Sequence, residues 1–173
     1  MSAITDKIVS VAKSYIGETE LPNNSGWKDA AFQQKMVDCG WQKGQSWCAF
    51  TTELIWKEAY GKDSPVYPLL DRLFSASATA TAANFIASKD FTTGKSPKEG
   101  ALVLWRHGTG WQGHAGVVTK VIDGINFKSI EGNTNSAGGR EGIEVAEKNR
   151  KVGEAFKPKG LNIICFVYPK EVQ

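Results

Sequence analysis

Apolar positions recur at helical spacing in the first half of the chain and form short strand-like runs in the second half. Near the N-terminus, apolar side chains from Ile4 to Tyr15 fall on one helical face, and Gly17 follows as a stop signal. Further helices are predicted at residues 27–37, 47–60, 69–74 and 84–88. Gly61 ends the helix that contains Cys48.

The pattern changes after Lys95. The segments that follow are short, rich in Val and Ile, and separated by Gly or Asp turns, as is typical of strands. They comprise residues 101–105, 114–122, 126–131, 142–146 and 161–168. Helices first and strands second predict an α+β fold, in which N-terminal helices pack on an antiparallel β-sheet of about five to six strands. At 173 residues the chain can bury a core of its own, so we expect a single domain over residues 1–173.

Composition narrows the class of protein. The hydrophobic fraction of 41% and charged fraction of 23% are ordinary for a globular protein, and the net charge is only +3. The basic residues are scattered rather than gathered in a stripe, so we expect no nucleic-acid partner. The sequence contains no run of about 18 apolar residues, so no membrane span is predicted. Asp6, Lys7 and Lys13 interrupt the apolar stretch that a signal peptide needs.

Three cysteines, an odd number without paired spacing, do not suggest a disulfide framework. We therefore expect a protein that is made and folded in a reducing cytoplasm. We also expect it to be a monomer. Cys48 is the cysteine with a chemical context, because Ser46 is a candidate N-cap and places Cys48 in the first turn of a helix. There the helix dipole favours a thiolate, and free N–H groups can hold an oxyanion. The alternative is a small buried core residue.

The chain has two histidines. His114 begins an apolar strand, which would give its ring the fixed position that a general base needs, whereas His107 lies in a predicted loop. We therefore choose His114 as the base and keep His107 as the alternative.

Glu131 and Asn133 lie two positions apart at the end of a predicted strand. If the strand continues, alternation puts both on one face, where a carboxylate or amide can fix the tautomer of an imidazole. The alternative is that Gly132, Asn133, Thr134 and Asn135 form a turn.

Four segments together resemble the CHAP family, the cysteine, histidine-dependent amidohydrolases/peptidases, which are papain-like relatives of the NlpC-type wall peptidases. These segments are 46–50, 97–105, 113–118 and 130–133. The resemblance implies a papain-like fold with Cys48 as nucleophile, His114 as base and Glu131 as the group that orients the base. Asn133 matches a further polar position of the family's catalytic site.

By the same resemblance, the substrate is bacterial peptidoglycan, cut either at the amide between N-acetylmuramic acid and L-alanine or at a peptide bond. We expect Trp47, Gln45 and Trp111 to contact it, with Gln45 near the oxyanion. Some family members bind calcium through an acidic N-terminal loop. Here the corresponding positions 23–25 are Asn, Asn and Ser, so no metal or other cofactor is predicted.

The expected setting is a phage lysin or an antibacterial effector that acts on the cell wall after release or injection. An immunity protein or a delivery system would then be a further partner. Two other classes stay open. One is a non-catalytic wall-binding or phage structural module, which the intact Cys, His and Glu disfavour. The other is a cysteine-dependent deamidase or transferase toxin acting on a protein, which nothing in the sequence excludes.

Overall fold

The computed structural model describes residues 2–134 and 142–172. Its helices are α1 (Ala3–Ser14), the 3-10 turn η1 (Pro22–Asn24), α2 (Ala30–Asp38), α3 (Cys48–Tyr60), α4 (Tyr67–Leu73) and α5 (Ala78–Ala87). Its strands are β1 (Thr93–Gly94), β2 (Leu102–His107), β3 (Gly113–Val121), β4 (Asn126–Thr134), β5 (Glu144–Lys151) and β6 (Leu161–Val167). In these residues every helix precedes every strand, and the predicted α+β class is confirmed.

The strands form one antiparallel sheet in the order β1-β6-β2-β3-β4-β5. β2 to β5 follow one another as a meander, and β6 returns to pair with β2 on its free side. The described residues thus form six strands, within the predicted range. β1 was not predicted, because two residues are too few to show an alternating pattern.

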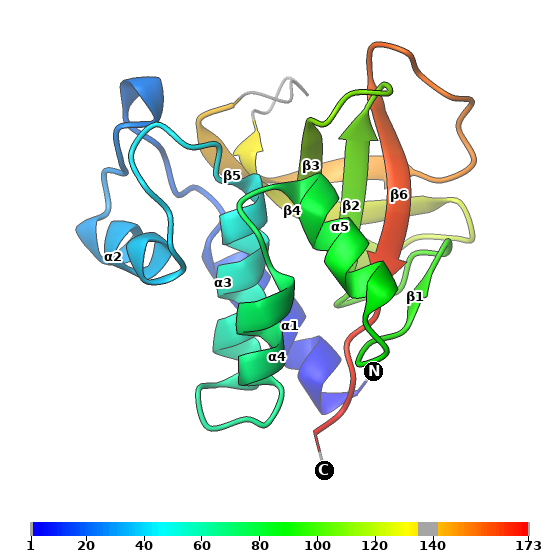
Figure 1. Ribbon diagram of the computed structural model, residues 1–173, viewed down its shortest axis with the longest axis horizontal. Coiled ribbons are helices and arrows are strands. Elements are labelled where there is room, and N and C mark those ends of the chain that lie inside the picture. The colour runs from blue at the N-terminus through cyan, green and yellow to red at the C-terminus, as the bar shows by residue number, and fades with distance from the viewer. Residues whose placement is uncertain (1, 135–141, 173) are drawn as a thin grey trace.

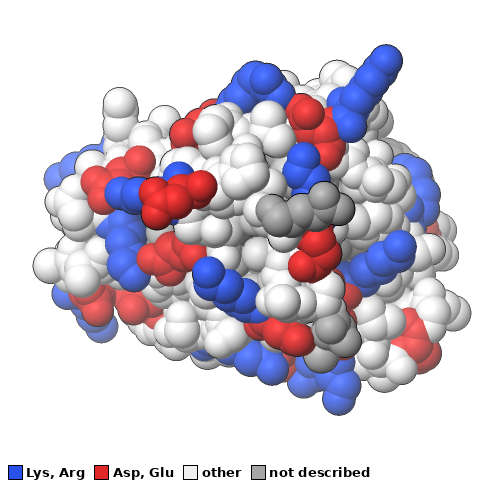
Figure 2. Space-filling view, turned by 90° about the horizontal axis from the view of Figure 1, so that it is seen from below, with Lys and Arg blue, Asp and Glu red and all other residues white. Residues whose placement is uncertain are grey.

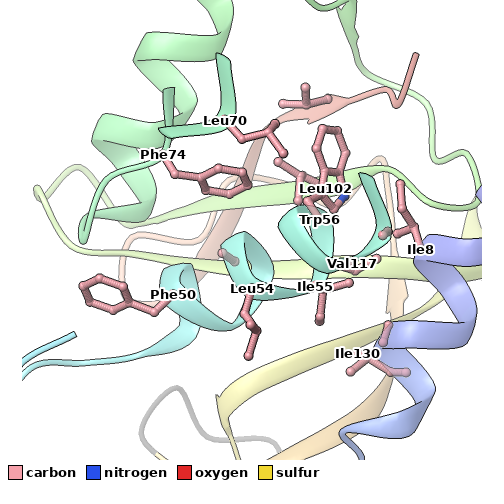
Figure 3. Packing of buried hydrophobic residues seen from close by; sticks show 14 of the residues in the cluster. Ile8, Phe50, Leu54, Ile55, Trp56, Leu70, Phe74, Leu102, Val117 and Ile130 are labelled. Carbon is pink, nitrogen blue, oxygen red and sulfur yellow. The ribbon is translucent and has the colours of Figure 1, made fainter. Parts of the chain in front are cut away.

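Helix α3 is the centre of the helical layer, which lies on one side of the sheet (Figure 1). Figure 3 shows Leu54, Ile55 and Trp56 of this helix packed among apolar side chains of α1 and of the strands. Trp56 is fully buried, and its Nε1 donates a hydrogen bond to the Gly100 carbonyl at 3.2 Å. Because α3 contacts both β3 and β4, this packing fixes its N-terminus relative to those strands.

A second apolar cluster covers the opposite face of the sheet. It comprises Ala101, Val103, Trp105, Val118, Phe127 and Phe166. With both faces covered, residues 101–105 are all buried, which explains why this segment is a continuous apolar run rather than an alternating one.

Four helix starts differ from the predictions. α4 begins at Tyr67 rather than at residue 69. α2 begins at Ala30 rather than at residue 27, because the Asp29 carboxylate caps it by accepting from two backbone N–H groups. α5 begins at Ala78, so the Ser/Ala/Thr-rich piece before residue 84 is itself helical. Ser46 is not the cap of α3. That position belongs to Trp47, whose side chain makes no capping bond.

The surface carries both signs of charge. On the face in Figure 2, Lys and Arg side chains are interspersed with Asp and Glu rather than gathered into one basic area. Among the described residues, no helix has the length and apolar character that a membrane crossing requires.

Candidate active site

Cys48 is the first residue of α3 and follows the N-cap Trp47. The first hydrogen bond of the helix runs from the Thr51 N–H to the Trp47 carbonyl at 3.0 Å, so the N–H groups of residues 48–50 have no partner within the helix. The residue is 6% exposed, so it lies just beneath the surface. A thiol in this position is next to both the positive end of the helix dipole and free backbone donors.

The imidazole of His114 and the carboxylate of Glu131 meet on β3 and β4. The distance between His114 Nε2 and Glu131 Oε2 is 2.7 Å, and both side chains are buried. The other ring nitrogen, Nδ1, is buried and has no hydrogen-bond partner in the described structure. The Cys48 thiol nevertheless interacts with the ring strongly enough to shift its pKa.

The pKa values of this pair move in opposite directions. Burial by itself lowers the pKa of His114, but its interactions with Cys48 and Glu131 outweigh burial and raise the pKa to about 9. Burial by itself raises the pKa of Glu131, but hydrogen bonds from Arg150 and His114 and their positive charges lower it to about 2. At neutral pH the site therefore favours an imidazolium beside a carboxylate.

Two glycines leave room for neighbouring side chains: Gly116 for Glu131, and Gly132 for Thr51 and Trp47. A Cβ on Gly116 would lie 2.7 Å from Glu131 Cγ. A Cβ on Gly132 would lie 2.2 Å from Thr51 Oγ1 and 2.8 Å from Trp47 Cζ3. Both distances at Gly132 are too short for a real contact, so only glycine lets β4 approach the first turn of α3 this closely.

The regular alternation that would put Asn133 on the face of Glu131 is interrupted, and a catalytic role for Asn133 stays a prediction. β4 does continue to Thr134, but its pairing with β5 shifts by one residue between Glu131 and Thr134. Asn133 has a φ of 52°, a left-handed conformation that breaks the period of two. No hydrogen bond joins Asn133 to His114 among the described residues. Asn135, the last residue of the alternative turn, lies outside the described residues.

The side chains of Trp47 and Gln45 make contacts within the fold. Trp47 is fully buried and packs edge-on against Trp27, so in this conformation it offers no surface to a ligand. Gln45 closes its own loop: its Oε1 accepts from the Gln42 N–H at 2.9 Å, and its carbonyl accepts from Trp41 Nε1 at 3.0 Å. A role for Gln45 at the oxyanion stays a prediction.

Trp111 is 78% exposed in the hairpin between β2 and β3, directly before the strand that carries His114. Its carbonyl accepts from the Thr79 hydroxyl of α5 at 2.7 Å, which ties this hairpin to the helical layer. Contact of Trp111 with a substrate stays a prediction. His107 is the last residue of β2 rather than part of a loop, and its register partner is Leu161 of β6.

The described residues contain no group of three or more His, Cys, Asp or Glu side chains suited to a metal ion. The two other cysteines, Cys39 and Cys165, are free thiols, and burial raises the pKa of Cys39 to about 12.

Sequence reasoning missed two donors to Glu131. Arg150 of β5 donates from Nε to Oε1 at 2.8 Å and from Nη2 to Oε2 at 2.6 Å. The Ser129 hydroxyl donates to Oε1 at 2.6 Å. The period of two along β4 could have identified Ser129. Arg150 could not be found in this way, because its contact depends on the register of β4 with β5.

A thiol at a helix N-terminus, an imidazole and a buried carboxylate, carried in this chain order by an α+β fold, are the arrangement of a cysteine hydrolase. The family model of the CHAP domain matches residues 33–133, more than half of the chain. The chain therefore belongs to the CHAP family, and this membership indicates a hydrolase of the amidase or peptidase type with a general function in peptidoglycan cleavage. Searches of curated proteins and of solved structures found no match.

Proposed function

We propose that this protein hydrolyses an amide bond of bacterial peptidoglycan, with Cys48 as nucleophile, His114 as general base and acid, and Glu131 as the group that orients His114. The observation that carries the proposal is the position of the His114 ring. Its Nε2 is occupied by Glu131 at 2.7 Å, which leaves Nδ1 for the thiol at the start of α3.

Acylation follows from this arrangement. Nδ1 of His114 takes the proton of Cys48 or already holds it as an ion pair, the sulfur attacks the carbonyl carbon, and a C–S bond forms as the carbonyl π electrons move to oxygen. Backbone N–H groups at the start of α3 donate to that oxyanion. The C–N bond then breaks, and the amine leaves with the proton that His114 held.

Deacylation reverses these roles. His114 takes a proton from water, the hydroxide attacks the acyl carbon, and the thiolate leaves and is protonated again. Glu131 accepts from Nε2–H throughout, so the ring keeps one tautomer and one orientation. The scissile bond is either the N-acetylmuramoyl-L-alanine amide or a peptide bond of the stem or cross-bridge. We propose action on the wall as a phage lysin or an antibacterial effector, and the net charge of +3 favours approach to an anionic wall.

The test is digestion of purified peptidoglycan by the wild type, by Cys48→Ala and by Cys39→Ala, followed by mass spectrometry of the released fragments. Cys39→Ala is the matched control, because it removes another free thiol by the same substitution. We expect fragments from the wild type and Cys39→Ala and none from Cys48→Ala. New L-alanine N-termini would indicate an amidase, and new termini within the peptide an endopeptidase.

Equal digestion by Cys48→Ala would eliminate Cys48 as nucleophile. Binding of peptidoglycan by the wild type without any fragment would favour a wall-binding module. A mass change on a protein substrate without muropeptide release would favour a deamidase or transferase.

A further inference from the structure

The carboxylate of Glu131 is held more completely than one hydrogen bond to an imidazole requires. Oε2 accepts from His114 Nε2 and from Arg150 Nη2, and Oε1 accepts from Arg150 Nε and from the Ser129 hydroxyl. The guanidinium binds both oxygens in parallel, a geometry that fixes the plane of the carboxylate. Glu131 therefore has little freedom to turn away from His114.

Arg150 also lies against the aromatic neighbour of His114. Its Cζ lies 5.2 Å from the ring centroid of Trp105, and the Trp105 ring lies 5.6 Å from the His114 ring at an interplanar angle of 33°. Trp105 and His114 are direct register partners on β2 and β3. One guanidinium thus contacts both the acid that pairs with the base and the ring that packs, tilted, against the base.

The charges explain why a second cation is needed. A buried carboxylate with no positive partner is strongly unfavourable. His114 is such a partner while it is an imidazolium, but it becomes neutral each time it gives its proton to a leaving group. Arg150, which stays charged, compensates Glu131 in that state as well.

We propose that Arg150 is a positioning residue of the active site, which keeps the Glu131 carboxylate ionised and in one orientation behind His114 through the whole reaction, a role that presupposes the cysteine hydrolase proposed above. Arg150 does not touch the reacting atoms. It acts through Glu131 and, by way of the Trp105 ring, on the face of His114.

The titratable and charged groups around this pair are few in the described structure. Cys48 faces His114 from α3, and Lys148 of β5 is the register partner of Ser129 and so shares the face of Glu131. Beyond β5, Glu154 acts on Arg150 through its charge and is itself paired with Lys157 at 2.7 Å. None of them takes the place of Arg150 on the two Glu131 oxygens.

The experiment compares Arg150→Met, Arg150→Lys, Glu131→Gln and the double variant Glu131→Gln/Arg150→Met with the wild type. Lys128→Met is the matched control, since it removes another ion pair between β4 and β5, the 2.7 Å contact of Lys128 with Glu147. We expect Arg150→Met to lower kcat on the order of 10- to 100-fold, the usual effect of removing a group that orients a functional residue. KM should change little, because the Arg150 guanidinium is bound to the Glu131 carboxylate and lies against Trp105.

The pH dependence of kcat distinguishes a positioning role of Arg150 from a role in stability alone. Without Arg150 the Glu131 carboxylate is protonated at higher pH, so the acid limb of kcat should move to higher pH in Arg150→Met. Arg150→Lys keeps the charge but not the double hydrogen bond, so the acid limb of its kcat profile should lie between those of Arg150→Met and the wild type. Lys128→Met should keep the wild-type profile. In the Glu131→Gln background, Arg150→Met should have no further effect on kcat.

Alkylation of Cys48 by iodoacetamide, located by peptide mass, gives the same pH profile without a substrate. A shifted alkylation profile in Arg150→Met supports the role of Arg150 even if peptidoglycan is not cleaved, so the two proposals fail separately. A folded Arg150→Met with wild-type kcat and alkylation profile would overturn the inference. A further loss of kcat on adding Arg150→Met to Glu131→Gln would also overturn it. If Arg150→Met alone does not fold, the test of the inference rests on the double variant and on Arg150→Lys. Neither of them leaves a buried carboxylate without a cation, so both should fold.

Discussion

Gly116→Ala is the smallest change that should displace the candidate acid. The added Cβ would lie 2.7 Å from Glu131 Cγ and 3.2 Å from the Ile130 carbonyl oxygen. Ordinary contact of a Cβ begins at 3.4 Å, so Glu131 would have to move by about 0.7 Å. Gly116 has no positive φ, so alanine suits the backbone there and the clash alone is tested.

The displacement has a definite chemical effect. If Glu131 moves away by that amount, its 2.7 Å contact with His114 lengthens to about 3.4 Å, where most of an N–H···O bond is lost. A hydrogen bond to a charged group contributes about 1.5–3 kcal/mol. Each 1.36 kcal/mol corresponds to a factor of ten in rate, so we expect kcat to fall on the order of 10- to 100-fold. Strain from overpacking should also lower the free energy of unfolding by about 1–3 kcal/mol.

The assay is the rate of fragment release from peptidoglycan, with urea unfolding measured in parallel. Gly124→Ala is the control, because a Cβ there meets nothing within 4 Å and the position lies in the turn between β3 and β4. Gly124→Ala should keep wild-type kcat and stability. A folded Gly116→Ala with wild-type kcat would refute the argument that Glu131 must stay within hydrogen-bonding distance of His114.

Two further predictions concern the candidate base. His114→Ala should lower kcat by orders of magnitude and His107→Ala should not, as measured by fragment release from variants whose circular dichroism is unchanged; the reverse result would move the base to His107. Stability should also depend on pH. The pKa of His114 is raised from 6.5 to about 9, so its contribution to the free energy of unfolding is full below pH 6.5 and is lost as pH rises through 9. The pKa of Glu131 is lowered from 4.5 to about 2, so its contribution is full above pH 4.5 and is lost as pH falls through 2. Urea unfolding followed by Trp fluorescence should show both losses in the wild type, and the alkaline loss should be absent in His114→Ala; an equal alkaline loss in both would contradict this pKa assignment.

Local sequence patterns were sufficient for the order of the helices and of strands β2 to β6, and for placing Cys48 in the first turn of α3. Periodicity of 3.6 or 2 and the turn residues between segments act over a few neighbours, so they can be recognised without knowing the fold. Cys48 was predicted in the first turn of its helix, and it is the first residue of that helix. The predicted cap, Ser46, was wrong by one position, since caps depend on the backbone conformation of single residues.

Tertiary packing decided that Trp47 is a buried core residue. Its position beside Cys48 suggested a substrate contact, but in the fold it fills the space next to Gly132 and Trp27. A tryptophan next to a reactive residue has the same local pattern whether it points outward or inward. Only the packing of α3 against β4 distinguishes the two.

By itself, the sequence determined the α+β class and the three segments that bear a thiol, an imidazole and a carboxylate, because these depend on local periodicity and on a family motif. The family resemblance also implied that Glu131 orients His114. The tertiary structure alone decided that Asn133 leaves the alternation and that Arg150 binds the Glu131 carboxylate from β5. Each of these depends on strand register or on a shift within it. Register is set by the packing of the whole sheet, and no local stretch of the chain contains that information.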